Sequence, residues 1–178
     1  MCRRMSGIFH PELKTLRNAS RHVAFLINEG YDPKQAATFV GNHFLLSERQ
    51  RLAIMRSVAR REQLDDRKLK EISVAAGSDQ EVYVDGFNNI ITLEVEVSDS
   101  ILFSCMDGTI RDLAALRGTY RIIPETYIAV KMLLDTLQDI GIRQAYILLD
   151  EPVSNSGRLK TLIANVGEKY SFGLDIQI

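Results

Sequence analysis

The sequence predicts an α/β protein in which a helical N-terminal module, residues 1–77, precedes a domain, residues 78–178, with a mainly parallel sheet between helices. In the first part, apolar residues recur at three- and four-residue spacing, the period of amphipathic helices. In the second part, apolar runs at 81–85 and 145–149 have the composition of buried strands. The long amphipathic stretch between them favours a parallel crossover. The linker Gly77-Ser78-Asp79-Gln80 marks the boundary.

The composition fits one domain with an appendage in a cytoplasmic protein. Apolar residues make up 46% of the 178 residues, which is enough for a core. Because no signal-peptide segment and no long apolar span are present, we expect no contact with a membrane. A net charge of −1 provides no global basic field, so binding of nucleic acid requires a local patch. Cys2 and Cys105 form no metal-ligand or disulfide pattern.

Capping signals divide the first part into helices. Gly30 is in the usual position of a helix C-cap, and Asp32 with Pro33 provides an N-cap and a first helical residue. Ser47 and Gln50 form a capping-box pattern. The predicted helices run from Pro11 to Gly30, from Pro33 to about Gly41, from Glu48 to about Gln63 and, as a short helix, over 65–76.

The third of these helices is strongly basic. Arg49, Arg56 and Arg60 lie close to one face, at spacings of seven and four residues. Such a face can follow the phosphates of a nucleic acid. The alternative is a solvated helix face, because Glu48, Glu62 and nearby aspartates dilute the positive charge.

The second part is predicted to alternate strands with helices. Polar and apolar residues alternate from Ile90 to Val97, which is the period of a half-buried strand. We expect this strand to pair with the next one as a hairpin. The predicted strands are 81–85, 90–97, 101–105, 145–149 and 174–178, and the predicted helices are 109–116, 124–140 and one that begins near Gly157.

Two aspartates, Asp85 and Asp150, each follow an apolar strand. If the two strands are neighbours in one parallel sheet, their carboxylates lie at the same edge, where α/β sheets bind ligands. Carboxylate oxygens are the ligands that Mg²⁺ and Mn²⁺ prefer, and Asp107 and Asp112 are candidates to join the site. Such a cluster can activate water against a phosphodiester. The alternative is that Asp85 and Asn88 form only an Asx-type turn.

Basic and polar side chains are expected to surround this acidic centre. The loop Ser154-Asn155-Ser156-Gly157 combines hydroxyls, an amide and a helix N-terminus, which favours phosphate, although an ordinary N-cap is the alternative. Asp85, Asp107 and Asp150 are the candidate catalytic residues, and with Asp112 they are the candidate metal ligands. The candidate substrate-binding residues are Asn88, Arg111, Arg117, Arg121, Ser154, Asn155, Ser156 and Arg158.

The stretch HPELKTLRNASRHVAFLINEGYDPKQAATFVGNHFLLSERQRLAIMRSVA resembles the helical module catalogued as Domain of Unknown Function 434. The motifs VDGFNNIITLE, DGTIRDLAALRGTYR and LLDEPVSNSGRLK resemble the domain usually fused to it. Together these motifs cover nearly the whole chain. The resemblance implies a two-module protein and brings no activity, because the family is uncharacterised.

The VDGFN segment is also similar to the opening motif of PIN-like nucleases, especially their NYN branch. This similarity implies a three-layer fold and a Mg²⁺- or Mn²⁺-dependent ribonuclease activity. It assigns Asp85 and Asp150 to acidic metal positions and Asn88 to the polar position of the motif. PIN-like domains normally carry further strands and acidic residues after the last strand found here, so the similarity also implies a domain that is truncated or that a partner completes.

Two functions follow as hypotheses. The first is a hydrolase that cleaves RNA with metal-activated water. The second is a catalytically inactive module that keeps the PIN-like shape and binds RNA or protein. A helical adaptor that assembles into a homo-oligomer is a third, less specific expectation.

Overall fold

A computed structural model describes residues 13–114 and 118–178 of the chain. The chain divides into two compact units. The first unit contains the residues up to Glu71 together with Ile101–Leu113, and the second contains Ile72–Ser100 together with Ala114–Ile178. No described helix is both long and apolar enough to cross a membrane.

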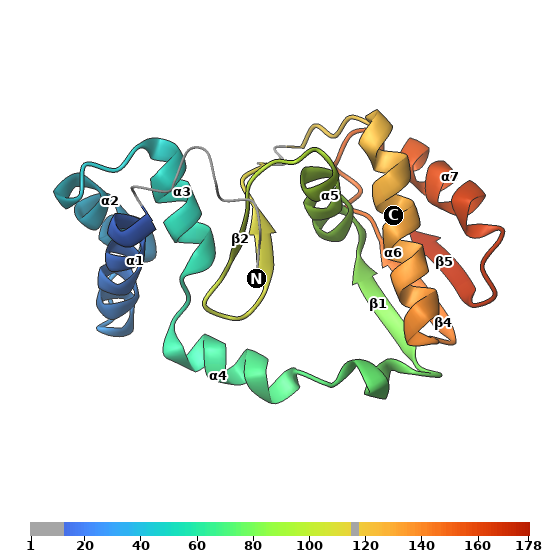
Figure 1. The fold of residues 1–178 in the computed structure, drawn as a ribbon, viewed down its shortest axis with the longest axis horizontal. Helices are drawn as coiled ribbons and strands as arrows, with labels where there is room; N and C mark the ends of the chain where they lie inside the picture. Colours follow the sequence, from blue (N-terminus) through green and yellow to red (C-terminus); the bar gives the residue numbers. More distant parts are fainter. Residues whose placement is uncertain (1–12, 115–117) are drawn as a thin grey trace. The chain divides into compact units, whose positions relative to one another are not determined.

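Four helices form most of the first unit: α1 (Leu13–Asn28), α2 (Pro33–His43), α3 (Glu48–Ser57) and α4 (Arg61–Lys70) (Figure 1). The predicted caps are confirmed. The Asp32 carboxylate accepts a hydrogen bond from the Gln35 backbone N–H at 2.9 Å, and Ser47 and Gln50 form both bonds of the capping box. The core of this unit consists of Ala19, Val23, Ile27, Ala36, Ala37, Val40, Leu46 and Ile54.

The boundaries of the later helices differ from the prediction. The third helix ends at Ser57 instead of continuing to Gln63, because Val58 takes an extended conformation (φ −96°, ψ 148°). A new helix, α4, starts at Arg61, and the one-turn helix η1 (Val74–Gly77) follows it. Arg60 is therefore the N-cap of α4 and does not belong to the same helix as Arg49 and Arg56. The prediction that Arg49, Arg56 and Arg60 form one face of a single helix is therefore wrong for Arg60.

A short antiparallel hairpin completes the first unit. Strand β2 (Leu102–Ser104) pairs with β3 (Ile110–Asp112). The strand expected at 101–105 is confirmed, but its partner is β3 and not residues 90–97. The helix expected at 109–116 is wrong for residues 110–112, which are extended, and residues 115–117 lie outside the described part.

The second unit contains a three-stranded parallel sheet. Its strands are β1 (Glu81–Asp85), β4 (Gln144–Leu148) and β5 (Gly173–Gln177), in the order β1-β4-β5. The connecting helices are α5 (Gly86–Val97), α6 (Pro124–Ile140) and α7 (Ser156–Gly167). The predicted mainly parallel sheet and the pairing of the 81–85 run with the 145–149 run are confirmed.

Residues 86–97 form helix α5, so the strand expected at 90–97 is wrong. The buried residues of this helix include Phe87, Ile90, Ile91 and Glu94, which recur at helical spacing. They pack against α6 and the sheet, and Asp85 caps the helix start. Tertiary packing therefore overrides the strand preference of the β-branched residues.

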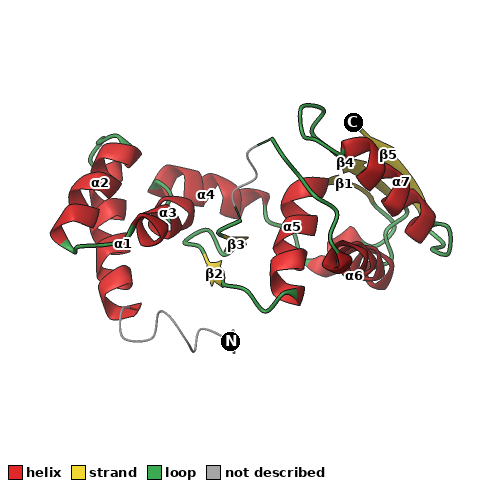
Figure 2. Ribbon diagram, turned by 90° about the horizontal axis from the view of Figure 1, so that it is seen from above, coloured by secondary structure: helices red, strands yellow, loops and turns green. Residues whose placement is uncertain are grey.

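The three connecting helices α5, α6 and α7 lie on the same face of the sheet (Figures 1 and 2). Because the chain moves in one direction from β1 to β4 to β5, two right-handed crossovers put their helices on the same side. Their core is formed with Val82, Val84, Ala145, Ile147, Leu174 and Ile176 from the sheet. The described part of the second unit thus has two layers, and the other face of the sheet is open.

Candidate functional site

The two predicted strand-end aspartates lie at the same edge of the sheet. Asp85 is the last residue of β1 and lies beside Leu148, the last residue of β4. Asp150 follows two residues later, and its carboxylate is exposed and forms no hydrogen bond or ion pair with another described residue. The edge on which the sequence placed these carboxylates therefore exists.

At this edge the Asp85 side chain caps the start of helix α5. One oxygen of its carboxylate accepts the Asn88 backbone N–H at 3.1 Å, and the other accepts the Asn88 side-chain amide at 2.5 Å. Asp85 is thus the N-cap of α5, and both oxygens already have one donor. The local turn that was the alternative to a metal site is present, although each oxygen retains a free lone pair.

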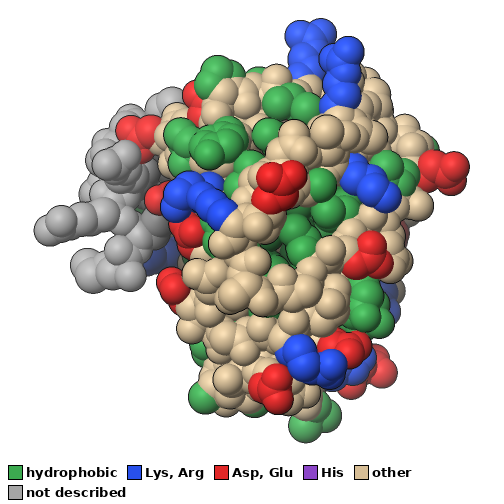
Figure 3. Space-filling view, turned by 90° about the vertical axis from the view of Figure 1, so that its right-hand side faces the viewer, with side chains coloured by type: hydrophobic (Ala, Val, Ile, Leu, Met, Phe, Trp, Pro, Cys, Tyr) green, Lys and Arg blue, Asp and Glu red, His purple; other side chains and the backbone are tan. Residues whose placement is uncertain are grey.

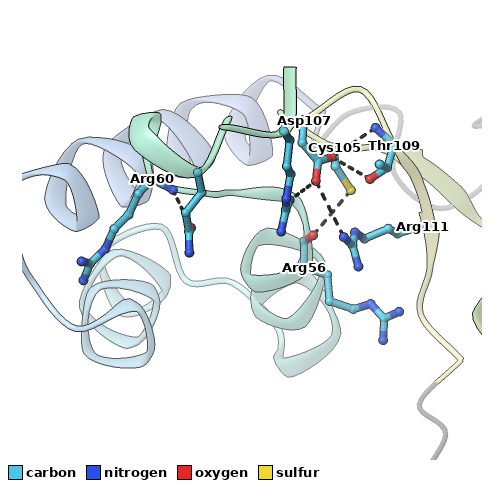
Figure 4. A network of polar contacts seen from close by, with 8 residues as sticks. Arg56, Arg60, Cys105, Asp107, Thr109 and Arg111 are labelled. Carbon is cyan, nitrogen blue, oxygen red and sulfur yellow. Dashed lines mark hydrogen bonds and ion pairs between the residues drawn. The ribbon is translucent and has the colours of Figure 1, made fainter. Parts of the chain in front are cut away.

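The other two predicted metal ligands lie in the first unit. Asp107, in the β2–β3 turn, accepts hydrogen bonds from the Thr109 N–H at 3.1 Å and the Thr109 hydroxyl at 2.6 Å (Figure 4). Arg67 and Arg111 form ion pairs with its carboxylate. Asp112 is buried and lies 3.9 Å from the Arg56 guanidinium. Both carboxylates therefore serve the docking of the hairpin.

The surroundings of Asp107 keep it ionised. Burial acts to raise the pKa of this carboxyl, but the Thr109 hydrogen bonds and the charges of Arg67 and Arg111 outweigh burial and hold the pKa below its ordinary value. Within the described residues, no group of three or more His, Cys, Asp or Glu side chains could hold a metal ion. The predicted site of three or four carboxylates draws its members from both units, Asp107 and Asp112 from the first and Asp85 and Asp150 from the second, and it stays a prediction.

Basic residues surround a pocket in the second unit. Arg121, Ile122, Asn155 and Arg158 line an open pocket of about 240 Å³. Neither guanidinium forms an ion pair with another described residue. Seen from the side of α7 and β5, Lys and Arg side chains on this face are mixed with acidic and hydrophobic side chains (Figure 3). The positive charge of this pocket is that of the two arginines that line it.

Two segments distant in sequence build the pocket. The Asn155 side-chain amide donates to the Tyr120 carbonyl at 2.7 Å, and the Ser154 hydroxyl accepts the Tyr120 N–H at 3.0 Å. A β-bridge between Thr119 and Ser154 holds the same segments together. Arg121 follows directly, so these bonds fix the position from which its side chain extends.

The pocket includes the start of α7. Asn155, the N-cap, has a left-handed backbone (φ 65°) and does not cap the helix with its side chain. The first N–H groups of the helix consequently lack an intrahelical acceptor. Ser156 is buried, and its hydroxyl donates to the carbonyls of Val153 and Asp150 at 2.5 and 2.9 Å. Of the predicted loop residues, Asn155 lines the pocket, whereas Ser154 and Ser156 shape the loop.

The other predicted binding residues are not among the lining residues of this pocket. Asn88 bonds to Asp85, Arg111 belongs to the hairpin of the first unit, and Arg117 lies outside the described residues. Arg49 is exposed on α3.

Sequence reasoning missed a buried polar cluster behind the pocket. The Glu94 carboxylate, 6% exposed, accepts hydrogen bonds from the Tyr120 and Thr126 hydroxyls, each at 2.5 Å. Phe87 packs edge-on against the Tyr120 ring at 5.2 Å. Burial and the bond to Glu94 raise the pKa of Tyr120. If residues 86–97 are assigned to a helix, Glu94 lies on its apolar stripe, and a carboxylate at such a position indicates a buried polar cluster. The prediction of a strand at 90–97 concealed this signal.

The fold and the site define a two-unit α/β protein with an arginine-lined pocket at the carboxyl edge of a parallel sheet. Residues 74–178 match the family described as "Domain of unknown function (DUF5616)", and residues 15–70 match "Protein of unknown function (DUF434)". The chain belongs to the DUF5616 family and carries the DUF434 module before it.

One relative extends this relationship over both parts. The chain is 34% identical over 159 residues to "Uncharacterized protein MJ0935" of Methanocaldococcus jannaschii, which covers 88% of this chain and 75% of the relative. No solved structure matches the chain.

Proposed function

We propose that the second unit binds the phosphate groups of single-stranded RNA in the pocket of Arg121, Asn155 and Arg158. The observation that carries this proposal is the presence, around one pocket, of two arginines that form no ion pair within the described residues. A guanidinium without a carboxylate partner has its donors available for phosphate oxygens.

The other pocket groups support the same ligand. The first N–H groups of α7, which have no intrahelical acceptor, favour an anion, and their effect adds to that of the two guanidinium groups. Ile122 provides an apolar surface beside them, against which a base or sugar can lie. The pocket is open, as a ligand that continues beyond one nucleotide requires.

The test is the affinity of the full-length protein for a fluorescent single-stranded RNA, measured by anisotropy over a range of salt concentrations. Arg121→Ala and Arg158→Ala should each weaken binding and reduce the slope of log K against log salt by about one. Lys160→Ala is the matched control, since Lys160 is exposed on the same helix outside the pocket lining. If the pocket variants bind like Lys160→Ala, the RNA does not use this pocket.

A second candidate is metal-dependent RNA hydrolysis at the same edge, as the PIN-like three-layer fold would imply. It is supported by Asp85, the last residue of β1, and Asp150, which follows two residues after the end of the adjacent parallel strand β4. Mg²⁺ often uses only one or two carboxylates and completes its shell with water and substrate phosphates, so two aspartates fit such an ion. Asp107 and Asp112 have no place in this version of the site.

Calorimetry with Mg²⁺ and Mn²⁺ tests this candidate. The double variant Asp85→Asn with Asp150→Asn should lose metal binding and RNA cleavage and remain folded, because asparagine is a good N-cap for α5. Asp99→Asn is the control, as Asp99 lies in the turn after the other end of that helix. Metal binding that survives in the double variant would contradict the candidate and leave the phosphate pocket unaffected.

A further inference from the structure

The open face of the sheet has a defined chemical pattern. Alternate residues of each strand point to this face, because β1, β4 and β5 are parallel and in register. The residues of this face are Glu81, Tyr83 and Asp85 on β1, Gln144, Tyr146 and Leu148 on β4, and Gly173, Asp175 and Gln177 on β5. None of these positions carries lysine or arginine.

The centre of the open face is apolar and exposed. The rings of Tyr83 and Tyr146 stack with centroids 4.8 Å apart and planes 16° from parallel. Tyr83 is 69% exposed and Leu148 is 41% exposed. Parallel sheets are almost always covered on both faces, so an uncovered apolar centre is unusual for this type of sheet.

The rim of the open face is acidic. Glu81, Asp85 and Asp175 are exposed around the tyrosine pair, and Arg143, which precedes β4, bonds to Glu81 at 3.0 Å. The negative charge of this rim also acts on the tyrosine pair. The Glu81 charge, with burial and further contributions from Tyr83 and Asp175, raises the pKa of Tyr146. Since Asp85 and Asp175 form no ion pair with a described lysine or arginine, the charge of this face favours a cationic ligand.

The charge and the area exclude two other occupants. RNA is repelled by the acidic rim, although its bases stack on aromatic side chains elsewhere. A second copy would bring its own carboxylates against these. Three strands about 4.8 Å apart and five residues at about 3.3 Å each give a face of roughly 250 Å², well below the about 800 Å² per partner of a stable dimer.

We propose that the open face binds one basic amphipathic helix of another protein. A helix has a diameter of about 10 Å, and about 12 residues span roughly 18 Å, so one helix covers this face. Its apolar stripe packs on Tyr83, Tyr146 and Leu148, and flanking lysines or arginines reach the acidic rim. The bound helix supplies a third layer and covers the second face of the sheet.

The test uses a synthetic helical peptide of about 14 residues with leucine at helical spacing, lysine elsewhere and one tryptophan among the leucines. The protein contains no tryptophan, so the peptide is the sole source of indole emission. We expect a blue shift of that emission with full-length protein, and weaker binding at high salt. The same peptide with glutamate for lysine should not bind.

Variants locate the contact. Tyr83→Ala with Tyr146→Ala should weaken binding about tenfold or more, as for aromatic anchors at interfaces. Tyr127→Ala is the matched control, because Tyr127 is exposed on α6, on the opposite side of the sheet. Tyr83→Lys, a single change at a position 69% exposed that removes an aromatic anchor and adds a positive charge, should also abolish binding.

Several outcomes would overturn the proposal. These are no emission shift at low salt, equal binding of the glutamate peptide, or equal binding by the control and the double variant. A concentration-dependent dimer that Tyr83→Lys dissociates would assign the face to a second copy. Loss of RNA affinity in the tyrosine variants would assign it to RNA, and the arginine pocket is tested separately.

Discussion

Glu94 connects the inside of the second unit to its pocket. It is a carboxylate on the core side of α5 and accepts two hydroxyl groups, from Tyr120 and Thr126. Tyr120 in turn bonds through its backbone to the loop that ends in Asn155. A buried carboxylate is retained only if its hydrogen bonds are satisfied, so the cluster constrains all three residues at once.

Removal of one hydroxyl from this cluster should destabilise the protein. Tyr120→Phe leaves the buried Glu94 with one donor fewer, and we expect a loss of about 1–3 kcal/mol in the free energy of unfolding. Tyr127→Phe, at an exposed tyrosine, should change it by less than about 0.5 kcal/mol. Urea denaturation compares the two variants, and equal midpoints would rule out the cluster as a source of stability.

Tyr170 predicts a stability change at alkaline pH. Its hydroxyl donates to the Asp135 carboxylate at 2.7 Å, and burial together with this bond raises the pKa of Tyr170 to about 12. Since the pKa is raised in the folded state, the contribution is complete below the ordinary pKa of about 10 and is lost as pH rises towards 12. Tyr170→Phe should remove this part of the alkaline dependence, as measured by thermal unfolding between pH 9 and pH 12.

At the scale of elements, the β2–β3 hairpin is held to the first unit by side chains from α3 and α4. Arg67 from α4 binds Asp107, and the Met106 N–H donates to the Ser57 carbonyl at 2.8 Å. The Cys105 thiol is buried at this contact, and burial raises its pKa. The exposure of Cys105 to a reagent therefore reports whether the hairpin is docked.

The hairpin should undock in acid. Because the folded state lowers the pKa of Asp107, its contribution is present above the ordinary value near 4 and is lost as pH falls through the folded pKa. Asp107→Asn should destabilise the first unit at neutral pH and flatten this acid dependence. In a Cys2→Ser background, the variant should also react with a thiol reagent about tenfold faster at Cys105. An unchanged rate would mean that Asp107 does not hold the hairpin.

How far the sequence predicts an element depends on whether its signals are local. Caps decided the starts of α2, α3 and α6 because a capping side chain and its backbone partner are only three residues apart, or because proline fixes the first turn. The pattern of residues 86–97 fits both the two-residue period of a strand and the period of a helix. Their packing against α6 and the sheet selects the helix. The same distinction holds for the candidate site. The positions of Asp85 and Asp150 follow from the ends of two strands and could be predicted, whereas the position of Asp107 depends on Arg67, which is distant in the sequence.

At the scale of the whole molecule, the chain passes between the two units three times. The first unit contains the residues up to Glu71 and also Ile101–Leu113. The latter residues lie within the segment 74–178 that matches the DUF5616 family. The predicted boundary at residue 77 describes the chain as two consecutive modules. Sequence alone cannot reveal the interleaving, because it results from contacts between residues more than thirty positions apart.

This interleaving predicts that the first unit is unstable alone. A protein that ends at Glu71 lacks the hairpin and leaves Arg67 without Asp107, so it should unfold at a lower urea concentration than the full chain. By contrast, full-length protein cleaved in the exposed segment 71–73 should stay one particle in native size-exclusion chromatography and separate only under denaturing conditions. Separation of the native fragments would contradict the docking of the hairpin.

The connection between β1 and β4 also sets an order of events during synthesis. Glu81 pairs with Gln144, so β1 emerges from the ribosome long before β4, its partner strand in the described sheet, exists. The first unit is complete once the hairpin has emerged, about 30 residues earlier than β4. At a translation rate of about 5–20 residues per second, β1 and α5 remain without their sheet for seconds. The nascent chain therefore folds its first unit while the apolar strand that follows it is still unpaired, which makes β1 the segment most in need of protection during translation.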